Sequence, residues 1–231
     1  MDKPTRPTRL TCDLHTHTCY SRDSLTSLTD FLAACRRKGL ERVAVTDHGS
    51  IEGALRLQEM EPQRIIVGQE IYTTEGELIA YFLTRPVPSD CTPQGAIEQV
   101  HAQGGIVGVS HPLDRLRREA LGRKGVVAIL DQIDFLEVFN ARCIFPADNR
   151  AARELALAAG LPMTAGSDAH MLWELGRGTV LIEPFDSPRS LLANLQTAQI
   201  VGRRSPMWVH FFSSYARLRR RWGLSPQAGG Q

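Results

Sequence analysis

The sequence lacks several features that would place it in a specialised class of protein. Its 231 residues include five cysteines and no Cys-x-x-Cys pair, which argues against a disulfide scaffold or a zinc ribbon and for a reducing compartment. No uninterrupted apolar run could cross a bilayer, and none follows the polar start, so we expect neither a transmembrane segment nor a signal peptide. The net charge of +2 is too small to indicate a nucleic-acid-binding protein. A cytoplasmic protein is therefore expected.

Short apolar stretches typical of strands alternate with helical segments over most of the chain. Strands are expected at 11–18, 42–46, 64–68, 77–83, 106–109, 135–139 and 162–166, and helices at 30–38, 51–60, 93–103, 121–133 and 147–159. This alternation is typical of a parallel sheet, and about seven such units favour an α/β fold in which the sheet closes, or nearly closes, into a barrel. A doubly wound open sheet is the alternative.

Polar residues gather where the predicted strands end. Side chains two apart on a strand share a face, so Asp13, His15 and His17 are expected to point the same way. The residues that share this placement at strand ends or in the adjacent loop are His15, His17, Asp23, His48, Glu70, His111, Asp168 and His170. By contrast, His101 lies inside a predicted helix and is interpreted as a surface or packing residue.

Histidines and carboxylates in this arrangement are typical of a metal site. The C-terminal ends of the strands are where barrel enzymes build their active sites, whereas an open sheet would concentrate ligands at one switch point. If the barrel closes, the first and last strands are neighbours, and the His15/His17 pair faces the Asp168/His170 pair. Taken alone, His15 and His17 would fit two surface histidines on an edge strand equally well.

The motifs that carry these residues resemble the polymerase and histidinol phosphatase (PHP) superfamily. They are Asp13–Thr18 with Ser21-x-Asp23-Ser24, Thr46–Gly49, Gly68–Glu70, Ser110–Pro112 and Gly166–His170, in the family's order. The resemblance covers residues 10 to about 180. It implies a distorted (β/α)7 barrel with up to three metal ions at the C-terminal ends of the strands, usually with phosphoesterase activity.

The resemblance also implies a ligand set. The first metal would be held by His15, His17, Glu70 and Asp168, the second by the bridging Glu70 with His111, and the third by Asp23, His48 and His170. Many relatives have a further second-site histidine seven residues after the bridging glutamate, where this chain has Glu77. Glu77 is either a replacement ligand or an exposed strand-end carboxylate. Asp13 and Asp47 are interpreted as groups that orient imidazoles.

These ligands suit two or three divalent ions of zinc, manganese or iron. The predicted function is a metal-dependent phosphoesterase that hydrolyses a small phosphomonoester, a nucleotide or the end of a short oligonucleotide through a hydroxide bridging two ions. The expected catalytic residues are Glu70, His111, Asp168 and His170. Arg142 is the candidate phosphate-binding cation, with a solvated surface arginine as the alternative, and Arg177 is no better a candidate. The alternative function is a catalytically silent PHP module that acts as a binding or structural partner.

The predicted domain organisation is a barrel over residues 1–205, an amphipathic basic helix over 206–224 and a disordered tail over 225–231. Apolar residues at helical spacing lie beside a cluster of arginines in the second segment: Trp208, Phe211, Phe212, Tyr215, Leu218, Trp222, Arg217, Arg219, Arg220 and Arg221. This pattern is interpreted as a helix that docks on the barrel with a solvated basic face. The alternative is weak contact with an anionic surface, either lipid or nucleic acid.

Overall fold

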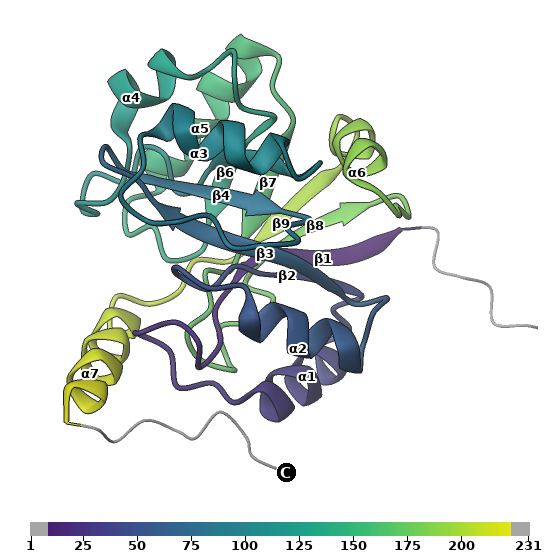
Figure 1. Cartoon of the computed structure of the whole chain (residues 1–231), viewed down its shortest axis with the longest axis vertical. Coiled ribbons are helices and arrows are strands. Elements are labelled where there is room, and N and C mark those ends of the chain that lie inside the picture. The colour runs from purple at the N-terminus through teal and green to yellow at the C-terminus, as the bar shows by residue number, and fades with distance from the viewer. Residues whose placement is uncertain (1–8, 223–231) are drawn as a thin grey trace, which may run out of the picture.

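The computed structural model describes residues 9–222 and contains one mixed sheet of nine strands within them (Figure 1). The strands are β1 (Leu10–Thr16), β2 (Arg42–Val45), β3 (Ile65–Tyr72), β4 (Glu77–Tyr81), β5 (Ile106–Val109), β6 (Phe135–Asn140), β7 (Met163–Gly166), β8 (Gly178–Ile182) and β9 (Gln199–Gly202). Their order across the sheet is β7-β6-β5-β4-β3-β2-β1-β8-β9. Strands β1 to β7 therefore follow one another around the sheet, and β8 and β9 extend it beyond β1.

The sheet nearly closes on itself between β1 and β7. Thr16 forms an isolated parallel bridge with Ala169, and the backbone N–H of His17 donates to the carbonyl oxygen of Ala169 at 2.9 Å. The N–H of Asp168 donates to the carbonyl oxygen of His15 at 2.8 Å. The predicted α/β fold with a nearly closed barrel is confirmed, and the first and last strands of that barrel are neighbours.

The expected parallel pairing is correct for only part of the sheet. β4 runs antiparallel to both β3 and β5, and β8 runs antiparallel to β1 and β9. β3 and β4 are joined by the short segment 73–76 with no helix between them, and such a connection can only produce a hairpin. Strands β8 and β9 follow the last strand expected from the sequence and were not predicted.

Seven helices are present in residues 9–222: α1 (Leu28–Arg37), α2 (Glu52–Met60), α3 (Pro93–His101), α4 (Gly122–Ala128), α5 (Pro146–Ala159), α6 (Pro188–Leu195) and α7 (Val209–Arg221). The Ser27 hydroxyl caps α1 by accepting from the N–H of Asp30, and Gly160 ends α5 at a φ of 66°. In Figure 1, α1 and α2 lie on one side of the sheet, α3 to α5 on the other, and α7 at the margin of the molecule. None of these helices combines the length and apolar character needed to span a membrane.

Two apolar clusters pack the strands. The larger joins the helices to the sheet, and the smaller includes Leu14, Tyr81 and Phe135. The rings of Tyr81 and Phe135 stack at 4.9 Å, and the Tyr81 hydroxyl donates to the carbonyl oxygen of Leu14 at 2.8 Å. Full burial of each such side chain contributes about 1.5–3 kcal/mol to stability. This packing holds β1 in place at Leu14, the residue before His15.

The observed α7 lies within the helix predicted for residues 206–224. α7 contacts the barrel, so the structure does not separate it from the preceding residues as an independent unit. The division of the chain at residue 205 stays a prediction. The predicted tail at 225–231 lies outside the described residues.

Candidate metal centre

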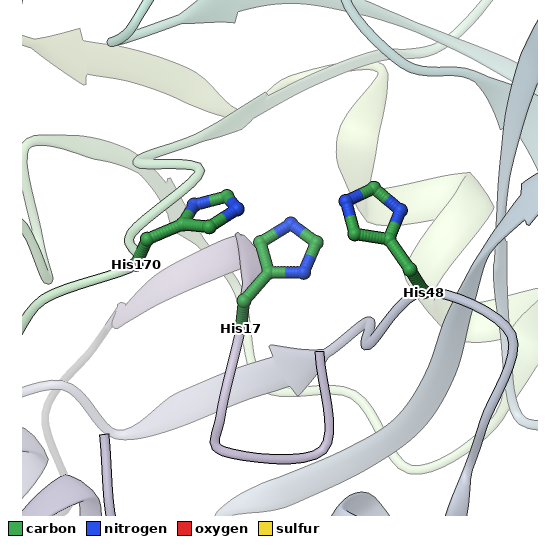
Figure 2. Close-up of side chains that lie close together, drawn as sticks. All are labelled: His17, His48 and His170. Carbon is green, nitrogen blue, oxygen red and sulfur yellow. The ribbon is translucent and has the colours of Figure 1, made fainter. Parts of the chain in front are cut away.

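Side chains from the C-terminal ends of β1 and β3, from the start of β4 and from the loops after β1, β2, β5 and β7 converge at one end of the barrel. Figure 2 shows His17, His48 and His170 around a common centre. The ring centroid of His17 lies 4.7 Å from that of His48 and 4.2 Å from that of His170. Three residues distant in the sequence are therefore brought together, as expected for a site built on strand ends.

The predicted first ligand group converges on a single point. Nε2 of His15 and Nε2 of His17 lie 3.2 Å apart. Each lies 3.1–3.3 Å from Oε2 of Glu70. Oδ1 of Asp168 lies 3.3 Å from Nε2 of His17 and 3.8 Å from Nε2 of His15. Four atoms of the ligand type therefore face one another, and all four side chains are buried.

Glu70 connects this group to a second one. Its other oxygen, Oε1, lies 2.8 Å from Nε2 of His111, which is in turn 3.3 Å from Oε2 of Glu77. Oε1 of Glu77 lies 3.5 Å from Nδ1 of His48. Glu77 is only 3% exposed, so the alternative of an exposed strand-end carboxylate is wrong. The carboxylate points into the cluster.

The predicted third group lies on the outer side of the first. Nε2 of His170 is 3.1 Å from Oδ1 of Asp23, and Nε2 of His48 is 3.9 Å from Oδ2 of Asp23. His48 also faces the second group through Nδ1, so its two ring nitrogens point to different carboxylates. The structure thus brings together all nine predicted ligands, and it leaves His101 outside, paired with Asp134 at 2.9 Å.

The rings of the first histidine pair are oriented by partners that differ from the predicted ones. Nδ1 of His15 lies 3.0 Å from Oε1 of Glu137, and Nδ1 of His17 lies 2.9 Å from the hydroxyl of Ser21. That hydroxyl donates to Asp47 at 2.7 Å, so Asp47 orients His17 through Ser21, in keeping with its predicted role. Both rings then turn Nε2 towards the centre of the site.

Asp13 does not lie beneath the imidazoles as predicted. Its carboxylate accepts from the backbone N–H groups of Ser167 at 2.9 Å and Gly176 at 2.8 Å. The register of β1 against β2 shifts between Asp13 and Thr16, so the simple alternation of side chains along the strand is interrupted there. Asp13 instead ties β1 to the segments around β7.

Carboxylates dominate the electrostatics of the first group. Burial lowers the pKa of His17, but Asp168 and Glu70 outweigh it and raise the pKa to about 9. Burial likewise opposes protonation of His15, yet Glu70 and the other carboxylates hold its pKa well above the ordinary value. Without a bound cation, these two imidazoles therefore carry protons that a cation would have to displace.

In the third group, the pKa values of the two histidines are lowered and not raised. Burial lowers the pKa of His170 to about 4, despite the neighbouring Asp23. Burial also lowers the pKa of His48. Both rings are therefore neutral at physiological pH and offer a free lone pair to a cation.

An arginine that the sequence did not single out lies at the site. Arg117, from the loop before α4, pairs with Oδ2 of Asp168 and lies 3.5 Å from Asp114. Burial raises the pKa of Asp168, but Arg117 and His15 outweigh it and hold that pKa well below the usual range. Nothing in the local sequence separates Arg117 from its exposed neighbours Arg115 and Arg118, because only the course of the loop turns it inward.

Arg142, the predicted phosphate-binding residue, is buried and has polar neighbours around its guanidinium. Nη1 lies 2.8 Å from Nδ1 of His170, and Nε lies 3.2 Å from Glu174. Nη2 donates to the carbonyl oxygen of Val209 at 3.0 Å and to the hydroxyl of Ser213 at 2.9 Å. Arg142 therefore links the site to α7.

A cavity of about 880 Å³ leads from solvent to the third group. Its lining includes Asp23, His48 and Tyr72 on the barrel, and Arg217 and Leu218 on α7. The ring of Tyr72 stacks on His48 at 4.8 Å. α7 therefore forms part of the mouth, a position that was not predicted from the sequence.

The donor groups fit divalent cations. Oδ1 of Asp168 and Nδ1 of His48 are buried and make no hydrogen bond with any described residue, although ionisable groups lie within 3.5 Å. Buried polar atoms are normally hydrogen-bonded, so atoms of this kind are explained by coordination to an ion. The set contains imidazole nitrogens and carboxylate oxygens without a cysteine, which suits zinc, manganese or iron.

Comparisons with known proteins agree with this geometry. A family model described as the PHP domain matches residues 13–142, and a second, described as PHP-associated, matches residues 146–200. The uncharacterized protein MJ1587 of Methanocaldococcus jannaschii is 37% identical over 142 residues, which cover 56% of this chain and 81% of that protein. The probable phosphatase YcdX of Escherichia fergusonii is 27% identical over 227 residues, covering 82% and 92%.

The fold is also similar to that of solved structures. A two-domain protein from Bacteroides vulgatus, described as containing a predicted PHP-like metal-dependent phosphoesterase, superimposes with a TM-score of 0.68 at 19% identity. The match covers 87% of this chain and 68% of that one. The PHP-domain match alone spans more than half of the sequence and contains seven of the nine converging side chains. The chain belongs to the PHP family.

Proposed function

We propose that this protein is a metal-dependent phosphoesterase that hydrolyses a small phosphomonoester, a nucleotide or the phosphorylated end of a short oligonucleotide. At the coarser level, the chain is a phosphoesterase of the PHP superfamily with a His/Glu cluster able to bind divalent metal. One observation carries the finer proposal. Nine imidazole and carboxylate side chains meet at the ends of the barrel strands, and a cavity leads to them.

The side chains divide into three groups in this proposal. His15, His17, Glu70 and Asp168 would hold one ion, Glu70, Glu77 and His111 a second, and Asp23, His48 and His170 a third. Two or three such ions, of zinc, manganese or iron, would supply Lewis-acid chemistry and a nucleophilic water at neutral pH. Glu70, His111, Asp168 and His170 are the proposed catalytic residues.

Arg117 and Arg142 have different roles in this proposal. Arg117 lies beside Asp168 and lines the inner part of the mouth, so we assign it the contact with the phosphoryl oxygens. Arg142 was the candidate from the sequence, but its guanidinium is already engaged by His170, Glu174 and α7. We assign Arg142 the positioning of His170 and of α7.

Two barrel residues would keep the first imidazole pair in the form that coordinates a cation. Glu137 would accept a hydrogen bond from Nδ1–H of His15, and the hydroxyl of Ser21 would accept one from Nδ1–H of His17. Each contact leaves the Nε2 lone pair directed at the centre. The backbones of His111 and Asp168 have positive φ values of 30° and 53°, an uncommon conformation for these residues that is frequent at functional sites.

The test is a panel of phosphate esters offered to protein reconstituted with each metal. The panel contains p-nitrophenyl phosphate, its bis-ester, histidinol phosphate, nucleoside monophosphates and short oligonucleotides phosphorylated at either end. The expected result is metal-dependent phosphate or nucleotide release that His170→Ala abolishes. His101→Ala is the matched control, because His101 is 42% exposed and lies away from the site. Folded, metal-loaded protein that turns over no ester would instead identify a silent binding module.

A further inference from the structure

The outward face of α7 is apolar and uncovered. Val209, Ser213 and Ala216 face the protein and are buried. Seven large apolar side chains on or beside the opposite face are 42–77% exposed: Met207, Trp208, Phe211, Phe212, Tyr215, Leu218 and Trp222. Their three- and four-residue spacing places them along one side of the helix. Contiguous exposed apolar patches of this kind mark interaction sites.

α7 is attached to the barrel through its opposite face, so the outward face is not exposed because of a loose helix. Arg142 donates from Nη2 to the carbonyl oxygen of Val209 and the hydroxyl of Ser213 on the buried face of α7. Trp208, at the edge of the outward face, also packs its ring against that of Trp173 at 4.9 Å while staying 47% exposed. α7 has therefore already used its other face to dock on the barrel. Within residues 9–222 the seven apolar side chains stay 42–77% exposed, which leaves them free to contact another body.

The charge distribution along the chain indicates which kind of partner this face would meet. Residues 203–231 contain six arginines and no acidic residue or lysine. The whole chain carries a net charge of +2, so the part before residue 203 carries −4 and the C-terminal part +6. A second copy meeting this face through its own α7 would bring the arginines of the two copies together, which disfavours a symmetric dimer. Single-stranded nucleic acid uses aromatic stacking platforms, but here the exposed face also carries the aliphatic side chains of Met207 and Leu218, which have no ring for a base to stack on.

We propose that the outward face of α7 docks on an anionic phospholipid bilayer. Trp, Phe and Leu on one side of a helix with arginine at its margins is the composition of an interfacial helix that lies in the plane of the membrane surface. Both family-model matches end before α7. Arg217 and Leu218 also line the cavity that leads to the metal centre, and docking places its mouth beside the bilayer.

The full-length protein is tested by flotation with vesicles of phosphatidylcholine and phosphatidylglycerol in equal parts, and with vesicles of phosphatidylcholine alone. Binding to the anionic vesicles is expected, with a blue shift of tryptophan fluorescence and weakening as salt is raised. Replacing the exposed Phe211 and Tyr215 by serine should weaken binding at least about tenfold. Leu157→Ser is the matched control, since Leu157 is 62% exposed on α5, away from α7.

A second variant keeps the test valid if the serine substitutions perturb folding. Arg219→Gln, one turn after the exposed Tyr215, should weaken binding about fivefold at low salt, because one arginine near an anionic surface contributes about 1 kcal/mol. Equal binding to neutral and anionic vesicles would overturn the proposal. So would a self-association in sedimentation that the serine substitutions remove without any vesicle binding. Binding of single-stranded oligonucleotide without vesicle binding would overturn it as well.

Discussion

Replacing Glu77 by glutamine should change metal-free and metal-loaded protein in opposite directions. Glu77 is buried beside Glu70, and both carboxylates approach Nε2 of His111. Burial, with Glu70 as the next cause, raises the pKa of Glu77 well above its ordinary value. Glutamine keeps the shape of the side chain and removes both the charge and the anionic donor.

The sign of the stability change follows from that raised pKa. A carboxyl group with a higher pKa in the folded state than in the unfolded state costs no stability below its unfolded pKa of about 4.3, and costs increasingly more as the pH rises above it. Glu77→Gln should therefore stabilise the metal-free protein at pH 8 by about 1–3 kcal/mol, the usual penalty for a poorly compensated buried polar group. The gain should shrink towards zero near pH 4.

Metal binding should respond in the opposite sense. The variant would lose a negatively charged donor at the proposed second ion, so its metal affinity should fall by a factor of about 10–100 or more. Urea unfolding in the presence of a chelator at pH 4.5 and pH 8 measures the stability of the metal-free protein. Competition with a chromophoric chelator measures the metal affinity. Glu75→Gln is the control, because Glu75 is an exposed carboxylate two residues away. A Glu77→Gln protein that is less stable without metal, or that binds metal as tightly as wild type, would refute the reasoning.

A histidine at the same position tests the nature of the donor. Imidazole is softer than carboxylate, so Glu77→His should keep activity and move the best-activating metal from manganese or iron towards zinc. The comparison is a metal-activation series on both proteins. Identical metal rankings and pH profiles would show that the carboxylate does not contact the second ion.

Three further predictions follow from the site and the barrel seam. His15→Ala and Asp168→Ala should abolish phosphate release while circular dichroism stays unchanged, and near-full turnover with full metal content would contradict the assignment. Gly166→Ala should lower the free energy of unfolding by about 1–3 kcal/mol or more, because the new Cβ would lie 2.1 Å from Cβ of His15, whereas Gly95→Ala in a helix should not. Metal binding at pH 7 should release protons, since the pKa of His17 is about 9 without metal, and calorimetric heats that are equal in buffers of different ionisation enthalpy would exclude this.

The strand–helix alternation and the residues at the strand ends could be predicted from the amino-acid sequence. Both are local properties: a short β-rich run such as Arg42–Val45 is recognisable from its own composition, and its end is marked by the polar residues that follow. Since the ends of barrel strands meet at one rim, His48, Glu70 and His170 could be assigned to one site without knowledge of any contact. The motifs around these residues indicated the family.

The tertiary structure alone decided which way the remaining side chains point. The register shift in β1 turned Asp13 away from the imidazoles, and the antiparallel β4 carried Glu77 inward, where the sequence allowed a surface position equally well. Arg117 reaches Asp168, and Glu137 reaches His15, only through the fold, since the members of each pair are far apart in the chain. Such placements depend on register and loop course, which are set by packing between distant segments. The docking of α7 over the mouth is fixed in the same way.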